Sequence, residues 1–123
     1  MLQDRFSSGA AASAIAERVD SVSDIAPNLA RYLLAYPFGN AEGEASLDGR
    51  TRALAAVAGL TVLGNDRQLR VQIGRARDLG CNADEIVATI MQMADYAGIA
   101  TALNALSVAK AVLRRDGGGD EQD

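Results

Sequence analysis

The stretch from Asn82 to Leu113 constrains the fold of this chain more than any other part of the sequence. Asn82 is a suitable helix N-cap, and Glu85 stands three residues later, where a capping box places its acid. Apolar residues then recur at helical spacing until Gly98, and a second apolar segment follows. The pattern predicts two consecutive helices. No strand-like alternation or fixed-period repeat is visible elsewhere, so the predicted fold class is all-α.

One residue breaks the apolar pattern of the first of these helices. Asp95 lies on the same side as Met91 and Ala88, on or beside a face that we expect to be buried. Burying a lone charge is costly. The sequence therefore predicts that Asp95 has a partner, a raised pKa or water nearby.

Two weaker helices are expected near the N-terminus. Residues 10–19 carry a faint helical stripe, and Ser21 or Ser23 can cap a second helix with Pro27 in its first turn. Pro37 ends that helix, because the residue before a proline avoids helical backbone. The segment 38–46 follows, with turn residues and two acids, and is interpreted either as a solvated linker or as a loop that lines a site.

Two stronger helices are expected in the middle of the chain. Asp48 caps a helix over 49–63, which is apolar on nearly every side and is therefore expected to be surrounded by protein. Asn65 or Asp66 caps a helix over 67–79. In the last helix, over 99–113, we expect an apolar stripe of Leu103, Leu106 and Ala109, which four further residues widen to almost the whole circumference: Ala102, Ala105, Val108 and Val112.

Composition excludes several classes of function. The 123 residues indicate one domain over 1–115 with a disordered acidic tail over 116–123. A net charge of −4 argues against a nucleic-acid partner, and no apolar run reaches the roughly 18 residues of a membrane span. Without histidine, and with Cys81 as the only cysteine, neither a zinc site nor a histidine-based triad is expected. A cytoplasmic location fits these features. The composition is 49% hydrophobic but only 4% aromatic, which predicts a core completed by oligomerisation.

An ordered set of short motifs between Tyr36 and Leu113 resembles the carboxymuconolactone decarboxylase family, whose fold is shared with alkylhydroperoxidase D-like proteins. The matching segments are Pro37-Phe-Gly39, Leu47-Asp48, Thr51-Arg52, Leu63-Gly64, Gln68-Leu-Arg70, Gly80-Cys81, Asp84-Glu-Ile86, Gln92-Met93-Ala94, Tyr96-Ala-Gly98 and Ala102-Leu-Asn-Ala-Leu106. The resemblance implies a helical bundle with a central helical hairpin, assembled as a trimer or a hexamer, with pockets near subunit contacts.

The catalytic residues that the resemblance implies are only partly present in this chain. The redox branch of the fold uses a CxxC pair, which this chain lacks, so a thiol peroxidase is the weakest hypothesis. The decarboxylase branch typically has an acid, an Arg and a His at the positions of Asn40, Glu44 and Gln72. Histidine is suited to proton transfer near neutral pH, whereas glutamine does not titrate. These three replacements argue against the reaction that gives the family its name.

Other residues are candidates to replace the missing chemistry. Asp95 is the candidate general acid or base, Gln72 is a hydrogen-bond donor to a substrate carbonyl, and Tyr96 is the third catalytic candidate. The candidate substrate-binding residues are Tyr36, Asn40, Glu42, Glu44 and Arg52. The alternatives are structural: Asp95 pairs with Arg52 or Arg70 within or between subunits, Gln72 is an ordinary surface amide, and Tyr96 is a core ring.

The leading hypothesis is a diverged enzyme that acts on a small cyclic or polyketide-like molecule of secondary metabolism. It would decarboxylate, isomerise or cyclise its substrate by proton transfer, with no metal or other cofactor. The alternative is a non-catalytic oligomeric scaffold or small-molecule binder that retains the fold.

Overall fold

The computed structural model describes residues 9–35 and 47–117 of the chain, and its described residues are helical, with turns and no strand. The all-α class expected from the sequence is confirmed. The chain divides into two compact units, 1–46 and 47–123. The single domain expected over 1–115 stays a prediction. No described helix is long and apolar enough to cross a membrane.

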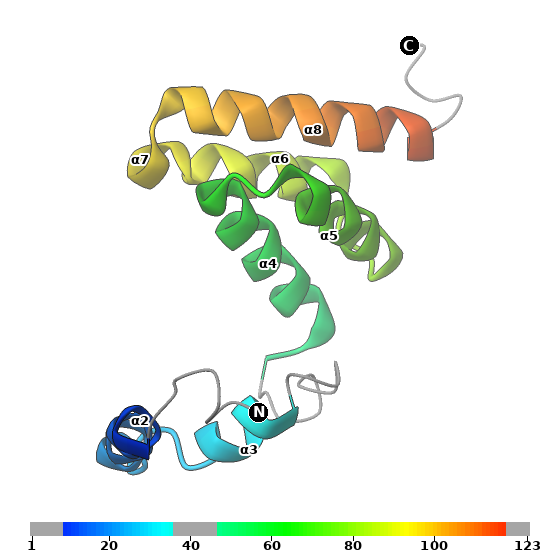
Figure 1. Cartoon of the computed structure of the whole chain (residues 1–123). Coiled ribbons are helices and arrows are strands. Elements are labelled where there is room, and N and C mark those ends of the chain that lie inside the picture. Colours follow the sequence, from blue (N-terminus) through cyan, green and yellow to red (C-terminus); the bar gives the residue numbers. More distant parts are fainter. Residues whose placement is uncertain (1–8, 36–46, 118–123) are drawn as a thin grey trace. The chain divides into compact units, whose positions relative to one another are not determined.

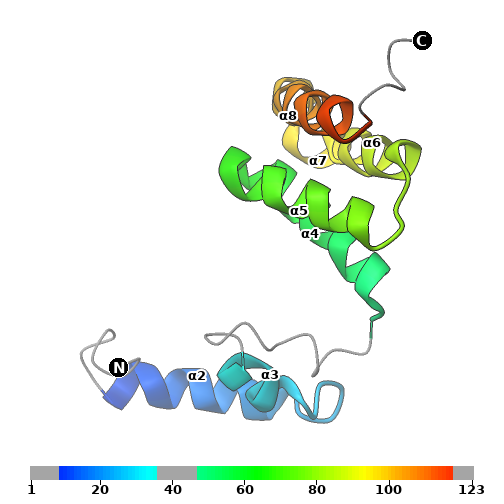
Figure 2. The ribbon, with the colours of Figure 1, turned by 90° about the vertical axis from the view of Figure 1, so that its right-hand side faces the viewer.

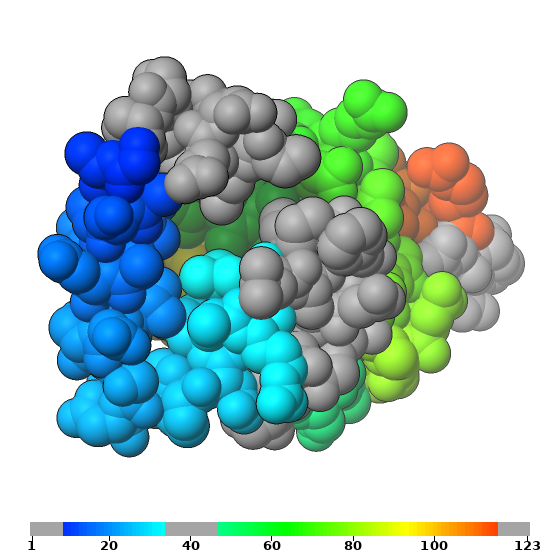
Figure 3. Space-filling view, turned by 60° about the horizontal axis from the view of Figure 1, so that its bottom comes forward, coloured from blue at the N-terminus to red at the C-terminus, as the bar shows by residue number. Residues whose placement is uncertain are grey.

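The first unit contains α2 (Gly9–Ser21) and α3 (Leu29–Ala35). No residue of α2 is buried, and the space-filling view shows side chains of both helices at the surface (Figure 3). Pro27 was expected inside the second helix, but α3 begins only at Leu29. Turns occupy 22–25, and the helical hydrogen bonding of α3 begins where Tyr32 N donates to Asn28 O at 2.9 Å.

The second unit begins with a helical hairpin of α4 (Gly49–Leu63) and α5 (Asp66–Asp78) (Figure 1). Asp48 caps α4 by accepting a hydrogen bond from Thr51 N at 2.8 Å, as expected. Gly64 ends α4 with φ 71°, a left-handed conformation that glycine adopts without strain. Asn65 then caps α5 through Gln68 N, which decides between the two expected caps.

Three helices complete this unit: α6 (Ala83–Gln92), α7 (Ala94–Ala97) and α8 (Ile99–Gly117). The long helix α8 packs against α5 and α6, as Figures 1 and 2 show from two directions. A single helix was expected from Asn82 to Gly98, but α6 ends before Met93. Met93 N donates to Ile90 O, three residues before it, and not to the residue four before it as in an α-helix. This 3₁₀-type hydrogen bond ends α6, and α7 starts after it.

The core of this unit lies between α4, α5, α6 and α8 and is built from small and medium side chains. Val57, Ile73, Ile86 and Ile90 are completely buried at its centre. Alanines fill much of the remaining core: Ala53, Ala76, Ala102, Ala105 and Ala109.

Two expectations about buried faces are wrong for the single chain. The helix over 49–63 was expected to be surrounded by protein, but Val62 and Leu63 are exposed. Leu103 was expected in the buried stripe of α8, but it is 57% exposed. Ala109 is buried as expected, and so are the four residues that were expected to widen the stripe, Ala102, Ala105, Val108 and Val112. Periodicity shows that a helix has apolar faces, whereas the neighbouring helices decide which face is covered.

Candidate functional site

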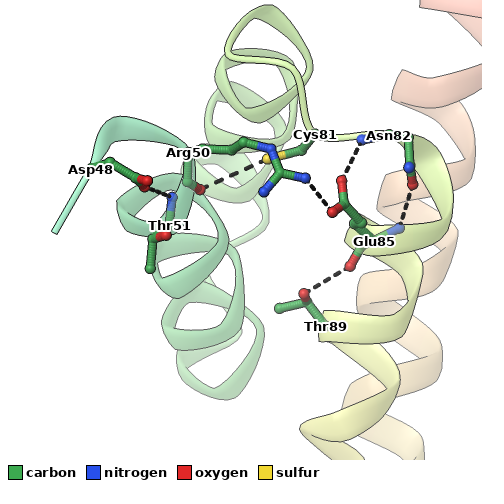
Figure 4. Close-up of polar contacts among 7 residues, drawn as sticks. All are labelled: Asp48, Arg50, Thr51, Cys81, Asn82, Glu85 and Thr89. Atoms are coloured by element: carbon green, nitrogen blue, oxygen red, sulfur yellow. Dashed lines mark hydrogen bonds and ion pairs between the residues drawn. The ribbon is translucent and has the colours of Figure 1, made fainter.

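The best-defined polar cluster joins the first turn of α4 to the start of α6 (Figure 4). Asn82 Oδ1 accepts from Glu85 N at 2.8 Å, and Glu85 Oε1 accepts in return from Asn82 N at 2.9 Å. This is the capping box that the sequence predicts. It orients the Glu85 carboxylate toward the neighbouring helix.

Arg50 of α4 binds the Glu85 carboxylate that the capping box orients. Its guanidinium donates through Nη2 to Glu85 Oε2 and forms an ion pair with it. A cation in the first turn of a helix is disfavoured by the helix dipole, and the ion pair with Glu85 compensates this effect for Arg50. Thirty-four residues separate Arg50 from Glu85, so the spacing alone did not identify the partner.

The cluster holds its carboxylates in the charged form. Hydrogen bonds from the Asn82 backbone N–H and then from Arg50 lower the pKa of Glu85 below its ordinary value. Hydrogen bonds from Thr51 lower the pKa of Asp48, and the contact with Glu85 raises the pKa of Arg50. A carboxylate that accepts from two donors is poorly suited to donate a proton at neutral pH. The cluster therefore has a structural role: it links the first turn of α4 to the start of α6.

Cys81 lies next to Arg50 in this cluster. Its side chain is buried, and Sγ lies 3.8 Å from the backbone O of Arg50. A free cysteine in such a position packs as a small apolar residue. Reactive thiols generally lie in partly exposed positions, so this placement favours a packing role.

The catalytic candidates Asp95 and Tyr96 lie together on the short helix α7. Asp95 is exposed, and Gln92 Nε2 donates to its Oδ2 at a long 3.5 Å. The expectation of a buried face is wrong for the single chain, because Asp95 shares its side of the helix with Ala88 and Met91, which are also exposed. No ion pair joins Asp95 to an arginine within the described residues. Tyr96 is 73% exposed, so it is not a core ring in the single chain.

Gln72 and Arg52 lie on the helical hairpin, on α5 and α4, and both are partly buried. Within the described part of the chain, neither side chain forms a hydrogen bond or an ion pair. No bond therefore connects Gln72 to Asp95 or Tyr96. The remaining substrate-binding candidates, Tyr36, Asn40, Glu42 and Glu44, lie outside the described residues.

Metal-binding residues are sparse in the part of the chain that the structure describes. No group of three or more His, Cys, Asp or Glu side chains is placed to hold an ion there. Two pairs of ionisable side chains stand out instead. Arg50 and Glu85 form an ion pair between α4 and α6, and Asp95 and Tyr96 are exposed neighbours on α7. The carboxylate of Glu85 accepts from two donors, whereas that of Asp95 has one long contact.

Comparison with known proteins supplies a family context for these residues. Residues 27–111 match the carboxymuconolactone decarboxylase family, a range that contains Arg52, Gln72, Asp95 and Tyr96. A similar protein is an uncharacterized 15.0 kDa protein in the nqo9-nqo10 intergenic region of Paracoccus denitrificans. It is 30% identical over 94 residues, which cover 75% of this chain and 70% of that protein.

Proposed function

Because the chain belongs to the carboxymuconolactone decarboxylase family, we propose that it is a diverged enzyme that acts on a small cyclic or polyketide-like molecule by proton transfer. The observation that carries this proposal is the difference between two carboxylates. Glu85 is occupied by two donors, whereas Asp95 has one long contact and is open to a ligand beside Tyr96. Of these two carboxylates, Asp95 is therefore the better placed to exchange a proton with a substrate.

The proposed chemistry is decarboxylation, isomerisation or ring closure, each of which needs a proton transfer. In decarboxylation the bond between a ring carbon and its carboxylate breaks, carbon dioxide leaves, and the electron pair moves into an adjacent carbonyl. Asp95 donates a proton to the ring carbon and is reprotonated from water. Gln72 donates a hydrogen bond to the carbonyl oxygen, and the Tyr96 hydroxyl orients the ring. Arg52 binds the substrate, and the four candidates within 36–44, which lie outside the described residues, stay predictions.

We further propose that the enzyme is a homo-oligomer, a trimer or a hexamer, and that the assembly encloses the site. Asp95 and Tyr96 are exposed in one chain, whereas a general acid works best where water is excluded and the neutral carboxyl group is favoured. A covering subunit supplies that exclusion. No cofactor is needed for the proposed steps.

The test is a panel of small cyclic lactone acids and cyclic β-keto acids, incubated with the protein in D2O and followed by NMR. We expect loss of carbon dioxide, or exchange of a ring hydrogen for deuterium, with at least one compound. Asp95→Asn should lower the rate by about 10²-fold or more, which is the usual contribution of a positioned general acid. Asp84→Asn is the matched control, because Asp84 is also an exposed acid but lies in the first turn of α6, away from α7.

Two results would contradict the proposal. Full activity in Asp95→Asn would remove Asp95 from the reaction. Failure to transform any compound, with binding of some compounds at a site that includes Gln72, would instead favour the non-catalytic binder.

A further inference from the structure

Helices α5 and α8 carry most of the positive charge of the chain. Seven of its twelve basic residues lie on these two helices together with three acids, whereas the whole chain has a net charge of −4. The basic residues are Arg67, Arg70, Arg75 and Arg77 on α5 and Lys110, Arg114 and Arg115 on α8. Because α5 packs against α8, the positions of these cations can be compared along both helices.

One hydrogen bond fixes how the two helices face each other. Asn104 Nδ2 donates to Asp66 Oδ1 at 2.9 Å. Asp66 is the first residue of α5, whereas α8 has five residues before Asn104 and thirteen after it. From this contact α5 therefore follows α8 toward its C-terminal end, and Figure 1 shows both helices running in that direction. We name the line that begins at Asp66 and Asn104 the α5–α8 seam.

Three helical turns farther along the seam, both helices carry an arginine. Arg77 lies eleven residues after Asp66, and Arg115 lies eleven residues after Asn104. Eleven residues make about three turns, so each arginine lies on the same side of its helix as the residue that forms the hydrogen bond. Arg70 lies one turn after Asp66 and shares that side of α5. Three arginines therefore flank the seam.

The two helices are still packed together at the level of Arg77 and Arg115. Ala76 of α5 and Val112 of α8 are buried and belong to the same core. The axes of packed helices lie roughly 8–10 Å apart. At that spacing, the long side chains of Arg77 and Arg115 reach the same region of the surface, where their like charges repel each other.

No acid of the described residues balances these charges. The side chains of Arg70, Arg77 and Arg115 form no hydrogen bond or ion pair within the part of the chain that the structure describes. Asp78 is exposed, and one residue after Arg77 it lies about 100° away around α5. Arg77 is partly buried, and burying an unpaired charge is costly. An anion bound at the seam would offset both the burial and the repulsion.

Short side chains leave room for such an anion. Gly74 lies between Arg70 and Arg77 on α5, and a Cβ added there meets no atom within 4 Å. On α8, Ser107 and Ala111 are exposed between Asn104 and the basic end. The Ser107 hydroxyl adds an uncharged donor to the seam.

The residue types at the seam favour a particular class of ligand. A guanidinium group presents its donors in a planar fork that matches the oxygen atoms of phosphate and carboxylate groups. Three such groups favour an anion with at least two negative charges. Neither α5 nor α8 has an aromatic residue on which a nucleic-acid base could stack, which favours a small oxyanion over a single strand.

We propose that Arg70 and Arg77 of α5 and Arg115 of α8 form a binding site for a multivalent oxyanion, a phosphate or a polycarboxylate, at the α5–α8 seam. The site shares no residue with the proposed proton transfer and goes beyond the proposed function. A bound anion links α5 to α8 near the C-terminal end of both helices.

The test is a titration of the full chain with inorganic phosphate at pH 7 and constant ionic strength, in which NMR follows the arginine Nε–Hε signals. We expect the signals of Arg70, Arg77 and Arg115 to shift together and saturate, with a dissociation constant on the order of 1 mM or below. Arg115→Gln and Arg77→Gln should each weaken binding about tenfold or more, because a hydrogen bond to a charged group is lost.

Arg67→Gln is the matched control. Arg67 is an exposed arginine of the same helix, but it lies about 100° away from Asp66 and about three turns from Arg77. Its replacement should change the phosphate affinity less than twofold. Arg115 is exposed, so Arg115→Gln should keep the helical circular dichroism spectrum and preserves the test if Arg77→Gln does not fold.

Further probes distinguish the kinds of anion. Citrate represents the polycarboxylates, and saturable binding of either phosphate or citrate that Arg115→Gln weakens supports the site. No saturable binding of either anion, or equal losses in Arg67→Gln and Arg115→Gln, would overturn it. Tighter binding of a single-stranded DNA oligonucleotide, weakened equally by both variants, would also overturn it in favour of a diffuse nucleic-acid surface. These measurements do not depend on turnover, so a failed activity assay leaves this proposal standing.

Discussion

At the scale of single residues, the chain uses similar acids in different ways. Glu85 accepts from Asn82 N and Arg50 Nη2, and Asp48 accepts from Thr51 N, so both carboxylates are part of helix starts. Asp95 has one long contact to Gln92 and faces water. The number of donors around each carboxylate therefore separates structural acids from the candidate catalytic one.

Glu85→Gln should lower the urea midpoint of unfolding at pH 7, because the neutral amide loses the ion pair with Arg50 and weakens the capping box. Asp84→Asn is the control, since Asp84 occupies the same first turn. A midpoint equal to that of the control would show that the ion pair and the capping box do not contribute to stability.

The effect of Glu85 should depend on pH in a defined direction. Its pKa is lower in the folded chain than its ordinary value of 4.5, so its contribution is complete above that value. The contribution is lost as the pH falls from about 4.5 through the folded pKa, because the unfolded state takes up the proton first. Urea titrations of wild type and Glu85→Gln should therefore differ at pH 7 and converge in strong acid. A constant difference would contradict the lowered pKa.

At the scale of elements, the break between α7 and α8 shapes the candidate site. Gly98 has φ 94° and ψ 159°, a backbone conformation that is essentially restricted to glycine. It lets α8 start directly after the single turn that carries Asp95 and Tyr96.

Gly98→Ala should destabilise the protein by about 1–3 kcal/mol, because alanine is strained in this conformation. Gly74→Ala is the matched control. Gly74 lies inside α5 without positive φ, and an added Cβ there meets no atom within 4 Å. The control should stabilise the helix by about 0.5–1 kcal/mol. Chemical denaturation measures both changes, and a neutral Gly98→Ala would show that the break is not needed.

At the scale of the whole molecule, apolar side chains are distributed unevenly between core and surface. Alanines occupy much of the buried core of the second unit, whereas Leu63, Tyr96 and Ile99 are more than 70% exposed. A chain with this distribution gains further apolar burial when a copy associates with it.

The thermal midpoint of the wild type should therefore rise with protein concentration. For an oligomer that unfolds to single chains, mass action contributes about 1.4 kcal/mol for each tenfold increase and for each chain beyond the first. The midpoint of Leu103→Asp, which replaces an exposed apolar side chain with a charge, should depend less on concentration. Scanning calorimetry between a few and several hundred micromolar measures both, and identical slopes for the two proteins would contradict this expectation.

Part of the site could be predicted from the sequence, and part could not. The residue types at 72, 95 and 96 identified candidates, but the exposure of Asp95 did not follow from its helical spacing. Spacing showed that Asp95 shares a side with Met91 and did not show that this side faces water. The pairing of Arg50 with Glu85 likewise needed the contact between α4 and α6.

The sequence by itself determined the local features: the all-α class and the caps at Asp48 and Asn82, and it narrowed the cap of α5 to Asn65 or Asp66. These features depend on hydrogen bonds within a few residues, so residue identity is sufficient to predict them. Only the tertiary structure decided which helix faces are covered, which acid Arg50 binds, and that α6 stops before Met93. Those outcomes depend on which helices become neighbours. The apolar pattern of one helix is compatible with burial of more than one of its faces, so the pattern alone does not choose the buried face.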